Sequence, residues 1–198
     1  MNESSNQPPP VRQFTKQNVT VAVNVGVAIS EMRRSKRAIG ELNSQLLDDL
    51  MNSVQQWTIS GDVGVRFVWY ADTPQQSMLY ETWSDAMASM QESYIPHQVT
   101  NTNQSQAASV LKSNEDSASL MLVVPDTNAY SLQSVMKQDS IDAGNILNDI
   151  ERDRVIVFAP NMDRLSVQLA YNLTSMPLVI TNPNDLTDSI VRKPTAHQ

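Results

Sequence analysis

Short apolar runs alternate along the chain with longer stretches in which apolar residues recur every three or four positions. In the first run, residues 19–29, valine stands at every second position from Val19 to Val27, and the positions between carry small side chains. Two later runs, residues 120–124 and 155–159, contain no polar side chain. Such unbroken strands are typical of a parallel sheet that is covered on both faces.

The stretches between these runs predict amphipathic helices. Residues 35–57 carry apolar side chains at spacings of three and four, and Gly61 follows the expected end of this helix. Asn182 suits an N-cap and Pro183 the first turn of a last helix. The other predicted helices span residues 84–97, 105–112, 132–150 and 163–174. The helix over 132–150 is expected to divide near Ser140.

Two of the predicted strands, residues 63–71 and 77–83, are too closely connected to run parallel. The five residues 72–76 between them cannot form a crossover helix, so the third strand should be antiparallel and lie at an edge. The last strand is expected over residues 178–181. This order predicts a doubly wound α/β domain, with a mostly parallel six-stranded sheet, one antiparallel edge strand and helices on both faces.

The length of 198 residues indicates one domain. Residues 1–17 are polar and contain three consecutive prolines, so they are expected to form a flexible N-terminal arm. The domain is then expected over residues 18–193, with a short tail at 194–198. The chain opens without a basic and apolar leader and has no apolar stretch of about 20 residues, which predicts no membrane span. We expect a cytoplasmic protein, or one within a particle or complex assembled in the cytoplasm.

Composition removes several functional classes. The chain has no cysteine, which excludes disulfides, thiolate zinc sites and cysteine nucleophiles. Its formal net charge of −7 disfavours nucleic acid as a partner. It contains only two histidines and five glycines, and it has no Gly-x-Ser-x-Gly elbow, no phosphate-binding P loop and no Gly-x-Gly-x-x-Gly turn. The sequence therefore predicts a protein that is not an enzyme.

Several phrases, taken in order, resemble a von Willebrand factor A domain. The hairpin VGVRFVWYADTPQQSMLYETW, the loop Thr102-Asn-Gln-Ser-Gln-Ala-Ala, the strand LMLVVPDTNA and the closing stretch that starts at VIVFAPNMDRL are each similar to a segment of that family. The resemblance covers nearly everything between Val19 and Arg192. It implies the same doubly wound fold and a function in protein–protein interaction.

The family's defining feature is a metal-ion-dependent adhesion site. Its Asp-x-Ser-x-Ser motif, together with a threonine and an aspartate from later loops, holds Mg²⁺, and an acidic residue of the partner completes the ligand shell. The resemblance places Asn24, Gly26 and Ala28 at the three motif positions, and Thr102 (or Thr100) and Asp126 at the later ones. One charge and two hydroxyl ligands are lost. This degenerate site predicts no metal and no cofactor, with Mg²⁺ in an unusual shell as the alternative.

A basic cluster follows the degenerate motif. Arg33, Arg34, Lys36 and Arg37 hold four of the fourteen basic side chains of the chain within five residues. They could form a solvated charge run balanced by neighbouring glutamates. Alternatively, they could bind an acidic group of a partner directly, since arginine pairs with carboxylates through two hydrogen bonds.

These observations favour a non-catalytic interaction or scaffold component of a larger assembly, which binds without metal. The expected partners are other protein subunits in a hetero- or homo-oligomeric complex. A secretion or conjugation machine, a virion and an ATPase-linked complex all fit. Two alternatives remain open: a metal-dependent adhesion module with an unusual ligand shell, and a doubly wound enzyme with an unrecognised site.

Overall fold

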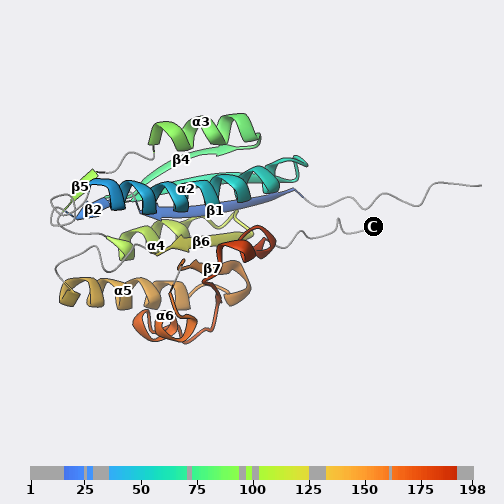
Figure 1. Cartoon of the computed structure of the whole chain (residues 1–198). Helices are drawn as coiled ribbons and strands as arrows, with labels where there is room; N and C mark the ends of the chain where they lie inside the picture. Colours follow the sequence, from blue (N-terminus) through green and yellow to red (C-terminus); the bar gives the residue numbers. More distant parts are fainter. Residues whose placement is uncertain are drawn as a thin grey trace, which may run out of the picture.

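Six strands form one sheet, in the order β4-β3-β1-β6-β7-β8 (Figure 1). The computed structural model describes residues 16–24, 26–28, 36–70, 73–93, 97–99, 103–124, 133–160 and 162–190. The strands of the sheet are β1 (Gln17–Asn24), β3 (Val63–Tyr70), β4 (Gln75–Tyr80), β6 (Ser119–Val123), β7 (Val155–Phe158) and β8 (Leu178–Ile180). All neighbours pair in parallel except β3 and β4, which are antiparallel. The predicted sheet, with its one antiparallel edge strand, is confirmed.

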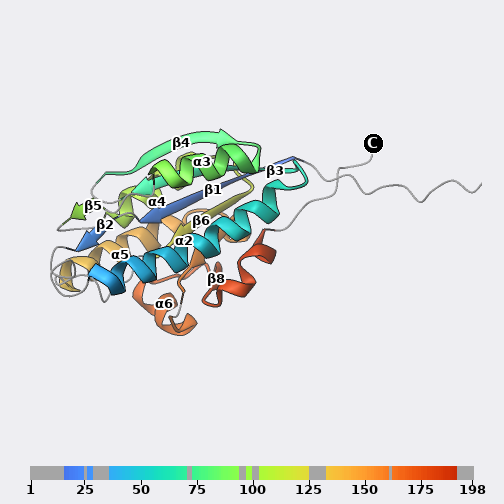
Figure 2. The same cartoon turned by 45° about the horizontal axis from the view of Figure 1, so that its top comes forward.

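Helices cover both faces of the sheet (Figures 1 and 2). On one face lie α2 (Lys36–Thr58) and α3 (Trp83–Ser93), and on the other lie α4 (Gln104–Ser113), α5 (Gln133–Asn148) and α6 (Arg164–Ala170). Three short 3₁₀ turns complete the described elements. One, η2 (Arg152–Arg154), precedes β7, and the other two, η3 (Pro183–Asp185) and η4 (Thr187–Ser189), follow β8. No helix in these described ranges is both long enough and apolar enough to cross a membrane.

The alternation of side chains along β1 divides the core into two layers. Val19, Val21 and Val23 point to the α2 face, and Ala22 points to the α4 face. All four are fully buried, as is Thr20 between them. The period of two that predicted this strand therefore also decides which helices each residue contacts. Gln17, the last residue of the predicted arm, is the first residue of β1.

The first apolar run forms two strands instead of the single strand predicted over residues 19–29. After β1 the chain continues into β2 (Gly26–Ala28), which pairs in parallel with β5 (His97–Val99) in a separate two-stranded sheet. Sequence reasoning assigned His97 to the end of a helix or a loop and did not find β5. Three residues are too few to show a strand period, and β5 is defined only by its pairing with β2.

Two of the predicted helices differ from the structure. The helix α5 continues through Ser140 without a break, because Ser140 is buried and bonded to the amide of Gln104. The helix α6 stops at Ala170, and the next residue but one, Asn172, has a positive φ of 48°, which a continuing helix cannot hold. Leu165 and Leu169 of α6 remain 62% and 73% exposed.

The predicted last helix is the pair of turns η3 and η4. Its predicted cap is confirmed: the side chain of Asn182 accepts a hydrogen bond from the backbone N–H of Asn184 at 3.0 Å, and Pro183 opens the first turn. Leu186 is fully buried, so this segment packs onto the α2 face of the sheet. It is fastened there by Trp57, whose indole N–H donates to the carbonyl of Thr187 at 2.8 Å.

The edge strand β4 carries an extra residue. Arg66 pairs with Leu79 and Val68 with Gln76, so two steps along β3 correspond to three along β4. The side chain of Ser77 repairs the ladder at this bulge. Its Oγ accepts a hydrogen bond from the backbone N–H of Phe67 at 2.9 Å and donates to the carbonyl of Met78 at 2.7 Å.

The helix α5 touches the chain after α6 at Gly144. A Cβ atom at this position would lie 1.6 Å from the backbone carbonyl oxygen of Tyr171, far inside van der Waals contact. Tyr171 is itself fully buried, and its backbone cannot move aside without shifting the turn that leads to β8. A glycine is therefore required here by close approach.

We expect Gly144→Ala to lower the free energy of unfolding by about 2 kcal/mol or more in urea denaturation, because a helix and a buried turn must separate. An ordinary helical glycine gives the opposite result, since alanine is favoured there by up to about 1 kcal/mol. The exposed neighbour Asn145, substituted by alanine, is the matched control and should leave stability nearly unchanged. A stabilised Gly144→Ala protein would contradict the close contact.

We expect Ser77→Ala to lower the free energy of unfolding by about 1–2 kcal/mol, because the N–H of Phe67 then loses its acceptor in a partly buried position. Ser77→Thr keeps the hydroxyl and should retain most of the stability. Met78→Ala serves as the control, since Met78 is 76% exposed. Equal stability of the alanine and threonine variants would show that the hydroxyl does not complete the ladder.

Candidate functional site

The carboxyl edge of the sheet is where the predicted site should lie. In Figure 1 this is the left end of the molecule, where the small β2–β5 sheet and the start of α2 are found. The starts of α4 and α5 lie at the same end. In a doubly wound domain ligands bind at this edge, because the loops that follow the parallel strands converge there.

Asn24, Gly26 and Ala28 are placed by the described backbone. Asn24 is the last residue of β1, is half-buried and lies opposite Tyr70 of β3. Gly26 and Ala28 lie in β2 and pair with His97 and Val99. Two of the three predicted motif positions therefore lie in a strand that pairs with β5.

The other predicted residues are only partly described. Lys36 and Arg37 are the first two residues of α2, whose start lies at the carboxyl edge, but their side chains are outside the described part of the chain. Arg33, Arg34, Thr102 and Asp126 also lie outside it, as does Thr100. The structure thus brings Asn24, Gly26, Ala28 and the start of α2 to one edge of the sheet.

The donor set at these positions does not fit the magnesium ion that the A-domain resemblance implies. Mg²⁺ requires about six oxygen ligands in a near-octahedral array. Gly26 and Ala28 have no side-chain oxygen, and Asn24 offers a neutral amide in place of a carboxylate. Among the residues whose side chains the structure describes, there is also no group of three or more histidine, aspartate or glutamate side chains that could hold a metal.

The start of α4 lies at the same edge and is held by a carboxylate from another helix. Asp139 of α5 accepts hydrogen bonds from the backbone N–H groups of Gln104 (2.9 Å) and Ser105 (3.1 Å). The side chain of Gln104 is fully buried and bonds to the hydroxyls of Ser140 and Tyr171. Burial raises the pKa of the Tyr171 hydroxyl, so this group is a neutral hydrogen-bond donor at every ordinary pH.

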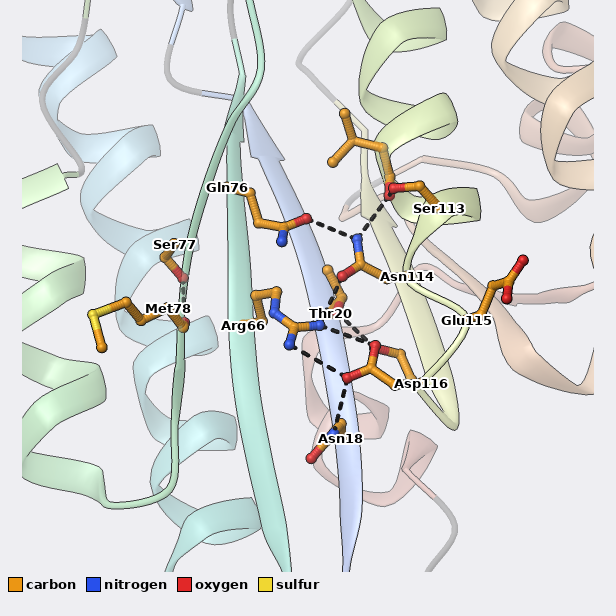
Figure 3. A network of polar contacts seen from close by, with 12 residues as sticks. Asn18, Thr20, Arg66, Gln76, Ser77, Met78, Ser113, Asn114, Glu115 and Asp116 are labelled. Carbon is orange, nitrogen blue, oxygen red and sulfur yellow. Dashed lines mark hydrogen bonds and ion pairs between the residues drawn. The ribbon is translucent and has the colours of Figure 1, made fainter.

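A second polar cluster lies at the other end of α4 (Figure 3). Arg66 of β3 points along the sheet toward the loop that follows this helix. Its Nη1 donates to Asn114 Oδ1 at 2.7 Å, and its two Nη atoms lie 3.2 and 3.3 Å from the carboxylate oxygens of Asp116. Asn18 also donates to Asp116 at 3.2 Å, and Asn114 donates to Gln76 at 2.9 Å.

This second cluster closes the loop between α4 and β6. Arg154 completes it by donating to the carbonyl of Ser117 at 2.9 Å, and Thr20 shares a 2.7 Å hydrogen bond with the hydroxyl of Ser117. The guanidinium of Arg66 and the carboxylate of Asp116 are bonded to each other. We therefore interpret the cluster as an internal fastening of β1, β3 and α4.

Sequence reasoning did not find these two clusters. Arg66 could have been noticed, since it is the only charged residue within the apolar strand VGVRFVWY. Asp139 gave no such signal, because acidic residues are common on the exposed faces of helices. Its role depends on contact with residues 34 and 35 positions earlier in the chain.

The stability contributed by Asp116 should depend on pH. The hydrogen bond from Arg66 is the main cause that holds the pKa of the Asp116 carboxyl below its usual value, and partial burial opposes it. A carboxyl whose pKa is lower in the folded than in the unfolded chain adds stability above the unfolded pKa, and that stability is lost as pH falls through the folded pKa.

We expect Asp116→Asn to cost at most about 1 kcal/mol at pH 7, because the carboxylate is half exposed. The difference from the parent protein should shrink below about pH 4 and vanish in stronger acid, as followed by urea unfolding across a pH series. Asp149→Asn is the control and should have a smaller effect, since Asp149 lies 3.6 Å from Lys112 and is 70% exposed. A difference that stayed constant with pH would contradict the role of the ionised carboxyl.

No family model matches the sequence, and no curated protein matches it either. Solved structures do match. Proximal thread matrix protein 1 from the mussel byssus superposes with a TM-score of 0.54 at 12% identity, over 89% of this chain and 46% of that one. The chain thus spans about half the length of this protein. Another structure of the same protein is described as having a zinc-occupied MIDAS motif, and it matches with a TM-score of 0.51 at 11% identity.

Two bacterial structures are similar to a comparable degree. A mutant of the PilB minor pilin from Streptococcus sanguinis matches with a TM-score of 0.54 at 11% identity, over 91% of this chain and 61% of that one. An aerotolerance-related membrane protein from Bacteroides fragilis matches with a TM-score of 0.51 at 10% identity, over 88% and 96%. At these identities the likeness concerns the fold alone. Together with the strand order, it shows that the chain has a von Willebrand factor A-like fold.

Proposed function

We propose that this chain is a non-catalytic protein-interaction module that binds an acidic surface of another subunit at its carboxyl edge, without a metal ion. The observation that carries the proposal is the composition of that edge. Gly26 and Ala28 lie in a paired strand and offer no side-chain ligand, while α2 begins at the same edge with Lys36 and Arg37. In a metal-dependent adhesion site, a metal ion bridges the partner's carboxylate to the domain. In this chain the carboxylate can pair directly with arginine.

The electrostatics of the α2 start favour an acidic partner. The amino end of a helix carries a partial positive charge, and Lys36 and Arg37 add two full charges where an acid is normally preferred. The first turn of α2 contains no acidic residue that could compensate. A carboxylate supplied by a partner would interact favourably with both the basic side chains and the helix dipole.

The fold neighbours support a role in assemblies. The matched structures include a minor pilin and the pilus adhesin SpaC from Lactobacillus rhamnosus GG, which matches with a TM-score of 0.51 at 12% identity over 89% of this chain. We propose that this chain likewise works within a larger complex, either a secretion or conjugation machine, a virion or an ATPase-linked complex. We place that complex in the cytoplasm, or in a particle assembled there.

The test uses a synthetic glutamate-rich peptide as the acidic probe and measures its binding to the full chain by fluorescence anisotropy in the presence of EDTA. We expect binding that persists in EDTA and weakens as salt is raised. Reversing the charge at Arg33, Arg34, Lys36 and Arg37 together should weaken it at least 10-fold, or about 1.4 kcal/mol.

The matched control reverses four exposed basic residues elsewhere, Lys112, Lys137, Arg152 and Arg164, and so changes the net charge equally. This variant should retain most of the affinity if the site is local. An equal loss of peptide affinity in both variants would show that net charge, and not a local site, causes the effect. Binding that appears only when Mg²⁺ is added would favour the metal-dependent alternative.

A further inference from the structure

The backbone N–H groups of Gln104, Ser105 and Gln106 at the start of α4 all have acceptors, although the helix supplies no acidic residue in its own first turn. The first four amides of a helix have no acceptor within it and need partners from outside. The N-cap residue Asn103 provides one of them, because its side chain accepts from the Gln106 N–H at 3.3 Å, and its carbonyl accepts the first bond within the helix, from the Ala107 N–H at 3.2 Å. The acceptors for the N–H groups of Gln104 and Ser105 come from Asp139 of α5.

Asp139 binds these two amides with one oxygen each. Oδ2 lies 2.9 Å from the nitrogen of Gln104, and Oδ1 lies 3.1 Å from that of Ser105. A carboxylate at this place accepts two charge-assisted hydrogen bonds and also interacts favourably with the helix dipole. One side chain of α5 therefore fixes the position of the first turn of α4.

The side chain of Gln104 ties the same turn to α5 and to the residue that follows α6. It is completely buried, donates to Ser140 Oγ at 3.2 Å and accepts a hydrogen bond from the hydroxyl of Tyr171, which follows α6. The first turn of α4 is thus tied to α5 through both its backbone and its side chain, and to the end of α6 through Tyr171. A buried polar group of this kind is costly to leave without its partners.

We propose that Asp139 is a positioning residue for the carboxyl edge. By holding the first turn of α4 with an internal carboxylate, it fixes the position of one of the helix starts at that edge. The inference rests on the proposed function for its consequence in partner binding. Its structural part, the fixing of the α4 start, can be tested without a partner.

The first experiment compares backbone amide hydrogen exchange in the full parent chain and in its Asp139→Ala variant. We expect the amides of Gln104 and Ser105 to exchange at least 10-fold faster, while the amides of Leu120 and Leu122 in the central strand β6 stay as protected as in the parent. Asp139→Asn, which preserves the volume of the side chain but can accept with only one oxygen, should accelerate fewer amides. It also serves as the second variant if the alanine protein folds poorly.

The matched control is Asp142→Ala on the same helix. Asp142 is exposed and, among the described residues, accepts a side-chain hydrogen bond from Gln138 of the same helix at 2.8 Å, so exchange at the α4 start should not change. Unchanged exchange of Gln104 and Ser105 in the Asp139 variants would overturn the proposal. So would a uniform acceleration over the whole sheet, because that would indicate a general loss of stability instead of a local role.

The second experiment measures the same glutamate-rich peptide with each variant. We expect Asp139→Ala to weaken binding several-fold and Asp142→Ala, which removes the same charge, to leave it unchanged. If charge reversal of the basic cluster abolishes binding while Asp139→Ala has no effect, the positioning role is wrong and the proposed function stands. If charge reversal has no effect, the proposed function fails, and the exchange data alone decide whether Asp139 holds α4.

Discussion

The burial of the middle of β1, from Val19 to Val23, is the constraint on which the rest of the structure depends. The strand pairs with β3 on one side and with β6 on the other, and helices cover both of its faces. Side chains from Val19 to Val23 are therefore inaccessible to water, and their sizes set how closely the helices of the two layers approach. Between Asn18 and Asn24, the one polar side chain on this strand is Thr20, which bonds to the hydroxyl of Ser117.

Each end of β1 is used differently. At the amino end, Asn18 joins the cluster of Arg66 and Asp116, which fastens the loop after α4. At the carboxyl end the chain passes Asn24 and enters β2, beside the start of α2. The helix α4 runs between these two ends, with polar partners from other elements at its first turn and at its last. The proposed contact with another subunit lies at the opposite, carboxyl end.

Most of the sheet could be predicted from the sequence, because β1 shows a period of two, β6 and β7 are unbroken apolar runs, and the connection between β3 and β4 is too short for a crossover helix. The helix boundaries were less certain. A break was predicted near Ser140, yet α5 continues through this residue, and its buried hydroxyl accepts a hydrogen bond from Gln104. The strand β5 could not be found, because three residues carry no period and their partner is about 70 positions away along the chain.

The candidate site could also be predicted only in part from the sequence. The loss of ligands at Gly26 and Ala28 is readable from residue types alone, and so is the clustering of Arg33, Arg34, Lys36 and Arg37. The pairing of β2 was not readable, nor was the role of Asp139. Both depend on contacts between residues far apart in the chain, and only the folded arrangement decides which of many similar acidic side chains reaches a helix start.

The bulge in β4 affects how copies of this domain can associate when they are concentrated. An outer strand with a long, regular row of unpaired backbone groups invites a strand of another molecule to continue the sheet. Here one outer strand is interrupted at Ser77, and the other, β8, has only three residues. Neither edge strand therefore offers a long, regular template on which a strand of another molecule could extend the sheet. Many copies could therefore be concentrated in one particle without fusing into fibres, and their contacts would be left to loops and helix ends.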